Sequence, residues 1–324
     1  MSDAKLDQML QPAADSPQPL LLTYSQDVKG YVLSYLGRSV LFLITCTSVL
    51  SVFLIFIFVG REAVPFLTRF SITEFLTSTK WYPEAEAAKF GALALIAGSA
   101  YVTFAALVFS VPIGVLAAVF LSDVVSFRVR NVVKPLIEIL AAIPSVAYGF
   151  FAVLILAPWM QSKFGFSTGT NALNASLILA VMALPTIISV AEDSISAVGR
   201  GLRQASYSLG ATRMETMLRV IIPAAHSGII AAIVLGMMRA IGETMVVWMA
   251  SGNAAQIPHP WWDLSQSVRT MTATIAGDMG ETAKDTPHYW ALFTVGLLLL
   301  VMTFLLNTVS EYFLARAKKA SGKQ

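Results

Sequence analysis

The stretch Gly228-IIAAIVLGMMRAIGETMVVWMA-Ser251 decides the fold class of this 324-residue chain. It is long enough and apolar enough to cross a bilayer as a helix, yet it contains Arg239 and Glu243. A charge at mid-membrane costs about 2.5–3.5 kcal/mol on insertion scales, so such residues usually face a protein interior and serve an ion or substrate path. A spacing of four places both on one helix face, where they can pair. The stretch therefore predicts a membrane carrier with a strongly polar spot in its middle.

The composition of the whole chain supports a membrane protein. Hydrophobic residues make up 56% and charged residues 13%, against about 25% charged in an average globular chain, and the mean hydropathy is +0.70. This predicts an all-α, polytopic membrane protein. The net charge of +3 is spread over short loops, which argues against nucleic-acid binding. The single cysteine, Cys46, excludes an intrachain disulfide.

Apolar runs of membrane length predict about six transmembrane helices. We expect a cytoplasmic head, partly disordered, over 1–37, a first transmembrane helix over 38–60 and a periplasmic loop over 61–89. A core of five transmembrane helices follows over 90–314, with a cytoplasmic coupling loop at 192–223 and a cytoplasmic tail over 315–324. Within the core, the predicted spans cover 90–121, 132–159, 172–190, 228–251 and 290–313.

Lysine and arginine counts in the short loops predict the orientation of the chain. Basic residues are denser in the head, in 122–135, in the coupling loop and in the tail than in 61–89, 161–171 and 252–288. The denser set should lie on the cytoplasmic side. With an even number of spans, both termini are then cytoplasmic, in an inner (cytoplasmic) membrane.

The coupling loop has the pattern of two short amphipathic helices joined at Gly210, which we expect to adopt a positive φ. Ala205, Leu209 and Met214 are among the residues that would supply apolar faces. This pattern fits a surface for docking a partner, or equally a helix that lies at the membrane interface. Just before it, Glu192 and Asp193 are expected to form a solvated helix end.

The spacing in this loop resembles the EAA loop of the permeases of ABC importers. Gln204-Ala205-Ser206 is followed after three residues by Gly210 and, after nine more, by Val220-Ile221-Ile222-Pro223. Gln204 and Ser206 depart from the usual Glu and Ala. In that family the loop inserts a coupling helix into a groove of an ATPase subunit, which implies a coupling role for these residues: Arg203, Gln204, Ala205, Ser206, Leu209, Gly210, Arg213, Ile222 and Pro223.

Two further motifs are similar to the PstC-type permeases of phosphate importers. They are Arg239-Ala240-Ile241-Gly242-Glu243-Thr244-Met245, with Ser251-Gly252-Asn253 behind it, and the run from Ala142 to Phe150. The similarity extends over about 90–313. It implies a MetI-like permease fold and four partners: a second, PstA-like permease, two PstB-like ATPase subunits and a PstS-like periplasmic phosphate-binding protein. ATP would be bound by the ATPase subunits, with no cofactor in this chain.

Arg239 is the first candidate for the substrate pathway, because a guanidinium can give a phosphate two parallel N–H bonds. Glu243 would repel an anion, so we expect it to pair with Arg239 in the resting state and offset the cost of a lone buried cation. The alternative is a purely structural ion pair that locks the fifth helix to its neighbours.

Four hydroxyl or amide side chains are further pathway candidates. Pro144 should disturb the third span, and Ser145 and Tyr148 bring hydroxyls close to that point. Thr244 and Asn253 could also donate to the anion. The alternative is an ordinary proline kink, with these side chains bonded to the backbone.

Together these features predict the permease subunit of an ATP-driven phosphate importer. The chain lacks the nucleotide-binding P-loop pattern Gly-x-x-x-x-Gly-Lys-Ser/Thr. We therefore expect that it is not an enzyme and that a separate subunit hydrolyses ATP. Its three histidines have no metal-ligand spacing. The main alternative is a secondary anion carrier or channel that works without an ATPase, against which the coupling loop argues. A membrane anchor without transport activity would have no need of Arg239.

Overall fold

The computed structural model describes residues 24–320. The predicted disorder of the head therefore lies largely outside the described residues, as does the end of the tail. Of the predicted head, 24–37 are helical. The elements in chain order are α2 (Tyr24–Arg69), α3 (Ile72–Thr77), β1 (Trp81–Tyr82), β2 (Lys89–Phe90), α4 (Leu93–Val119), the π-helical turn η1 (Phe120–Val124), α5 (Phe127–Ala142), α6 (Ser145–Phe151), η2 (Ala152–Leu156), α7 (Ala157–Phe164), α8 (Ala172–Ser196), α9 (Arg200–Ser208), α10 (Arg213–Thr216), η3 (Met217–Ile221), α11 (Ile222–Gly242), α12 (Met245–Ala250), α13 (Met271–Asp278) and α14 (Pro287–Ala320).

Six helical stretches of the described residues are long and apolar enough to cross a membrane, as predicted. They are 31–69, 93–124, 145–164, 172–196, 213–242 and 287–312. The chain divides into two compact units, 1–55 and 56–324. In the first unit, α2 exposes large apolar side chains such as Leu41, Phe42 and Phe53. An apolar helix with satisfied backbone bonds suits contact with lipid.

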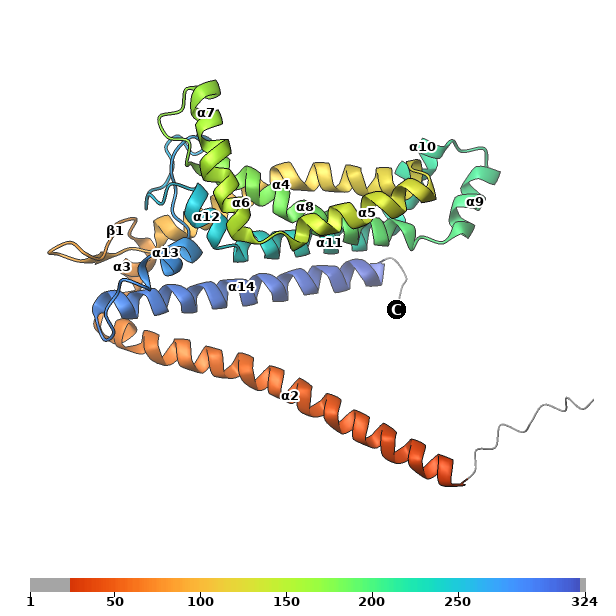
Figure 1. The fold of residues 1–324 in the computed structure, drawn as a ribbon, viewed down its shortest axis with the longest axis horizontal. Helices are drawn as coiled ribbons and strands as arrows, with labels where there is room; N and C mark the ends of the chain where they lie inside the picture. Colours follow the sequence, from red (N-terminus) through yellow and green to blue (C-terminus); the bar gives the residue numbers. More distant parts are fainter. Residues whose placement is uncertain (1–23, 321–324) are drawn as a thin grey trace, which may run out of the picture. The chain divides into compact units, whose positions relative to one another are not determined.

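The second unit is built around α8, with α4 and α11 packed along it (Figure 1). Ile187 of α8 is fully buried and lies between two glycines. A Cβ atom on Gly114 of α4 would lie 2.7 Å from its Cγ2, and one on Gly236 of α11 would lie 2.6 Å from its Cγ1. Small residues let membrane helices approach closely. These two glycines therefore allow three helices to share one side chain.

Two of the predicted spans, 132–159 and 228–251, are broken, and the stretches long enough to cross a membrane are 145–164 and 213–242 instead. Helix α5 ends at Ala142 and α6 begins at Ser145, because Pro144 has no N–H to continue the helical ladder. Helix α11 ends at Gly242 and α12 begins at Met245. The prediction of one continuous helix over 228–251 is therefore wrong. The half-helices α6 and α12, which follow the two breaks, contact each other.

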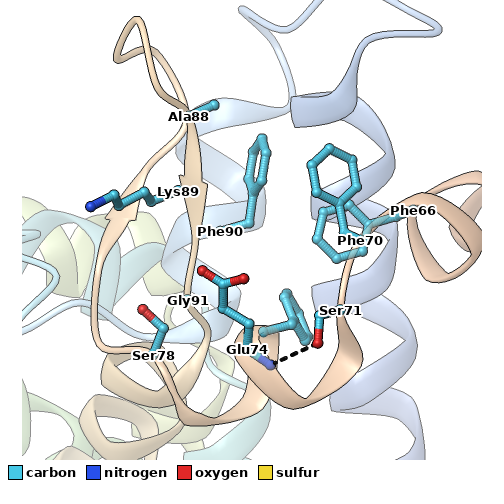
Figure 2. Close-up of a pocket in the computed structure, with 10 residues that line it drawn as sticks. Phe66, Phe70, Ser71, Glu74, Ser78, Ala88, Lys89, Phe90 and Gly91 are labelled. Carbon is cyan, nitrogen blue, oxygen red and sulfur yellow. Dashed lines mark hydrogen bonds between the residues drawn. The ribbon is translucent and has the colours of Figure 1, made fainter.

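The segment predicted as a loop at 61–89 is largely ordered structure. Helix α2 continues to Arg69, and α3 and the β1–β2 hairpin follow. Figure 2 shows Phe66, Phe70 and Phe90 gathered here around a small hollow into which the Glu74 side chain points. Phe75 also lines this hollow. Their rings make edge-to-face and stacked contacts. Aromatic packing of this kind explains why the segment folds against α4 and α14.

Candidate functional site

Arg239 lies in the last turn of α11 and bridges two neighbouring helices. Its Nη2 donates to the carbonyl oxygen of Ala141 at 3.3 Å, and its Nη1 donates to the Thr186 hydroxyl at 3.4 Å. Ala141 is in the last turn of α5, just before the break at Pro144. Thr186 directly follows Pro185 inside α8. The guanidinium is thus placed where one helix ends and another carries a proline.

The end of α5 also receives a bond from Tyr148. The Tyr148 hydroxyl donates to the Leu140 carbonyl oxygen at 2.9 Å, and the side chain is only 9% exposed. The last four carbonyls of a helix have no partner within it, and positive charge is favoured beside them. Tyr148 and Arg239 together satisfy two of these carbonyls. The chain thereby stabilises an end of a helix that the proline leaves open.

The predicted ion pair between Arg239 and Glu243 is wrong. Glu243 follows the end of α11 with an extended ψ of 134°, so the spacing of four no longer puts the two side chains on one helical face. Its Oε1 accepts from the backbone N–H of Thr244 at 3.2 Å, and its carbonyl oxygen accepts from the Thr272 hydroxyl at 3.0 Å. Within 24–320, no ion pair joins Arg239 to Glu243.

Glu243 instead borders a small polar cavity beside the break. The cavity has a volume of about 10 Å³, which is room for about one water molecule, and is lined partly by hydroxyl side chains of α4 and of the segment that enters α13. These hydroxyls belong to Ser99, Thr103, Thr270 and Thr272. Sequence reasoning missed them, because single serines and threonines in apolar helices carry no distinctive pattern.

The other three predicted residues are not all brought together. Thr244 occupies the second break and its hydroxyl donates to the Gly242 carbonyl oxygen at 3.4 Å. Ser145 is half-buried at the first turn of α6. Asn253 lies beyond the end of α12 with a φ of 54°, and its Nδ2 donates to the Trp248 carbonyl oxygen at 2.6 Å. Asn253 therefore caps α12 rather than joining Arg239.

The coupling loop has the predicted form. Helix α9 and the short helix α10 are joined at Gly210, whose φ of +84° is the expected positive value. Thr212 and Glu215 form a reciprocal capping box at the start of α10, which fixes the entry of the chain into the helix. Ser206 is buried and shares a 2.8 Å hydrogen bond with Thr216. Ile222 and Pro223 begin α11.

The exposed face of this loop is apolar. Leu209 is 89% exposed and Met214 is 68% exposed, and Leu218 continues the patch at 57%. Gln204, Ala205 and Arg213 are exposed as well. Arg203 differs from the rest, since it points inward and donates to Asp123 and to the Ile195 carbonyl oxygen. Exposed apolar side chains of this kind fit a docking surface or a helix at the membrane interface, and the contacts of Arg203 hold the loop against the bundle.

The expectation of a solvated helix end at Glu192 and Asp193 is half wrong. Asp193 is exposed, but Glu192 is 1% exposed and forms ion pairs with Arg130 and Lys134 of α5. Sequence separation hid this cluster, because its basic members lie about sixty residues before the acidic ones.

The half-buried guanidinium of Arg239 and nearby hydroxyls lie where α5 and α11 end, in a bundle whose other end carries the loop around Gly210, and these features fit the membrane component of a transporter. Residues 110–319 match the family described as "Binding-protein-dependent transport system inner membrane component". The chain belongs to this family. It is therefore a multi-pass protein of the inner membrane.

Relatives support this assignment. The chain is 38% identical over 245 residues to the "Probable ABC transporter permease protein YqgH" of Bacillus subtilis, with 76% of this chain and 78% of that protein covered. It is 34% identical over 267 residues to the "Phosphate transport system permease protein PstC" of Mesorhizobium japonicum, with coverages of 76% and 80%. The PstC protein of Pasteurella multocida is 31% identical over 269 residues, with coverages of 77% and 82%.

A solved structure shares the fold. The structure of the MetNI methionine ABC transporter in inward-facing conformations contains a chain that matches with a TM-score of 0.51 at 20% identity. The match covers 68% of this chain and 91% of that chain. The predicted MetI-like permease fold is thereby confirmed.

Proposed function

We propose that this chain is the permease subunit of an ATP-driven phosphate importer, and that Arg239 binds the phosphate on its way through the membrane. The observation that carries the proposal is the position of Arg239, at the junction of a broken helix with α8, in a chain whose relatives include phosphate transport permeases. A secondary anion carrier without an ATPase would have no use for the coupling loop.

The chemistry of the junction suits an anion that must lose its water. A guanidinium has five N–H donors in a fixed fork, and the bonds to Ala141 and Thr186 use two of them. The bond to Ala141 can be exchanged for bonds to phosphate, because a bidentate pair between two charged groups is stronger than a single bond from the guanidinium to a neutral carbonyl. Binding would therefore release the end of α5 from Arg239. Thr186, Tyr148 and Ser145 lie on the elements that meet there.

Glu243 would orient the anion rather than act as the counterion of Arg239. Its cavity lies beside the second break, and Thr270, Thr272 and Thr103 offer hydroxyls that can donate or accept. The cavity is too small for the anion in this conformation, so phosphate would reach Glu243 only after the second break opens. The carboxylate, which only accepts hydrogen bonds, would then bind a protonated oxygen of the anion and repel a bare one. In this arrangement Arg239 supplies attraction and Glu243 supplies orientation.

The partners follow from the same proposal. A second, similar permease would complete the pathway, and two ATPase subunits would dock on the apolar face around Leu209 and Met214. A periplasmic phosphate-binding protein would meet the opposite end, which carries β1, β2 and the 251–270 loop. Both termini would be cytoplasmic, as the distribution of basic residues indicates. ATP would be bound by the ATPase subunits, with no cofactor here.

The test is uptake of radiolabelled phosphate by proteoliposomes that hold all subunits, with ATP inside or absent. The proposal predicts uptake only with ATP and with the binding protein present. Uptake that is the same without ATP would support the secondary carrier instead.

A further inference from the structure

Helix α5 is attached to the bundle by polar contacts at its two ends rather than by a buried apolar face. None of its 16 residues is buried, and the apolar side chains of Leu136 and Ile139 are 56% and 59% exposed. Its last turn is bonded to Arg239 and Tyr148. A helix held in this way can change its angle to the bundle by exchanging a few hydrogen bonds, without repacking a core.

The attachment near its other end depends on the carboxylate of Glu192. Lys134 Nζ donates to Glu192 Oε2 at 2.8 Å, Ser196 Oγ donates to Oε1 at 2.8 Å, and Arg130 forms an ion pair with the same oxygen. At 1% exposed, this carboxylate is almost cut off from water. A buried charge is stable only when it is paired and hydrogen-bonded. Glu192 therefore needs α5 in its present position.

The same turn of α8 also holds the coupling loop. Arg203 of α9 donates to the Ile195 carbonyl oxygen at 3.2 Å and forms an ion pair with Asp123 of η1. The neighbouring Ser122 shares a hydrogen bond of 3.2 Å with Ser196. The hydroxyl of Ser196 thus bonds both to the Glu192 carboxylate and to Ser122 of η1, the turn whose Asp123 pairs with Arg203. These bonds connect α9 and η1 to the last turn of α8, whose Ser196 hydroxyl also binds the Glu192 carboxylate.

We propose that Glu192 is a positioning residue for transport. Its ion pairs attach α5 to the last turn of α8, which also binds the coupling loop; we call this attachment the latch. The latch thereby fixes the position of the last carbonyl groups of α5 relative to Arg239. Movement of the loop, driven by the docked ATPase subunits, would loosen the latch and move α5. The inference rests on the proposed function for the source of that movement and for the role of Arg239, whereas the attachment of α5 to α8 through Glu192 does not depend on it.

The direct test measures the distance between α5 and α8 in the assembled transporter in lipid nanodiscs. Spin labels are placed at Ile139 and Val181, which are exposed, in a Cys46→Ser background with cysteine-free partner subunits. We expect Glu192→Gln to broaden or shift the distance distribution without nucleotide. We also expect it to raise the ATP hydrolysed per phosphate transported several-fold, which a merely structural residue would not do.

The matched control is Asp193→Asn. Asp193 contacts Lys134 but is 63% exposed, so both measurements should stay at wild-type values. If Glu192→Gln fails to assemble, Glu192→Asp serves in its place, because it keeps the charge opposite Arg130 and Lys134 but shortens the side chain that reaches them. A wild-type distance distribution in the assembled variant would overturn the proposal. This readout needs no phosphate, so it remains decisive even if the transported anion is a different one.

Discussion

The guanidinium of Arg239 donates to the carbonyl oxygen of Ala141 at 3.3 Å, which joins the last turn of α11 to the last turn of α5 across 98 residues of sequence. Two helices that both end just before a break in the chain are thereby joined at their last turns. A helix C-terminus carries partial negative charge, which a cation beside it offsets. The same guanidinium can serve an anion when the helix end moves away.

The first prediction concerns the planar guanidinium group of Arg239 and its N–H donors. We expect Arg239→Ala to lower ATP-driven uptake by about tenfold or more, because a hydrogen bond to a charged group contributes roughly 1.5–3 kcal/mol. Arg239→Lys should recover little, since an ammonium cannot reproduce the planar fork. Uptake by proteoliposomes is the measurement. Arg128→Ala is the control, because Arg128 is an exposed arginine of α5. Normal uptake by Arg239→Ala would remove this residue from the pathway.

The second prediction separates stability from transport at Tyr148. Tyr148→Phe removes the bond to the Leu140 carbonyl oxygen and should destabilise the folded subunit by about 1 kcal/mol. The thermal unfolding midpoint in detergent should fall accordingly. Tyr82→Phe is the control, since Tyr82 is 57% exposed in the β1–β2 hairpin. Equal midpoints for the two variants would show that the hydroxyl of Tyr148 does not stabilise the end of α5.

The third prediction concerns the turn in the coupling loop. At a φ of +84°, Gly210 adopts a conformation that costs other residues about 1–2 kcal/mol. Gly210→Ala should therefore weaken binding of the ATPase subunits by about tenfold, as measured by titration in nanodiscs. Gly201→Ala is the matched control, because Gly201 lies within α9 and its added Cβ would meet open space. Identical affinities for the two variants would exclude a role for this turn.

The fourth prediction is a pH dependence in the 251–270 loop. Hydrogen bonds from the Ser265 hydroxyl, the Gln266 amide and the Ser265 N–H lower the pKa of Asp263. Since the folded pKa lies below the unfolded value of about 3.9, the stabilisation is fully present above that pH and is lost as the pH falls through the folded pKa. A spin label at the exposed Ile257 should become more mobile in that acid range only. In Asp263→Asn its mobility should not change with pH there.

Much of the architecture could be predicted from the sequence, because hydrophobic length and glycine chemistry are local signals. The six spans and the turn at Gly210 are of this kind. The partner of Arg239 could not be predicted, because it depends on whether α11 continues past Gly242. The Thr272 hydroxyl, 29 residues away in the sequence, donates to the Glu243 carbonyl oxygen and so stabilises the end of α11 at Gly242.

The burial of Glu192 shows the same limit. A Glu-Asp pair at the end of an apolar run is typical of a solvated helix end, and no local feature distinguishes the two carboxylates. Only the packing of α5 against α8 places Arg130 and Lys134 over Glu192 and leaves Asp193 exposed. Long-range pairing of charges carries no periodic signal in the sequence.

The most direct measurement of the central claim is chemical labelling at position 239 in the assembled transporter. Arg239→Cys, in a Cys46→Ser background, is treated with a charged methanethiosulfonate reagent in proteoliposomes, with and without phosphate and ATP. The account predicts that the thiol reacts in at least one state of the ATP cycle, because position 239 then faces the pathway. A thiol that never reacts in any state, in a transporter that still hydrolyses ATP, would show that this position is sealed off from the pathway and would contradict the account.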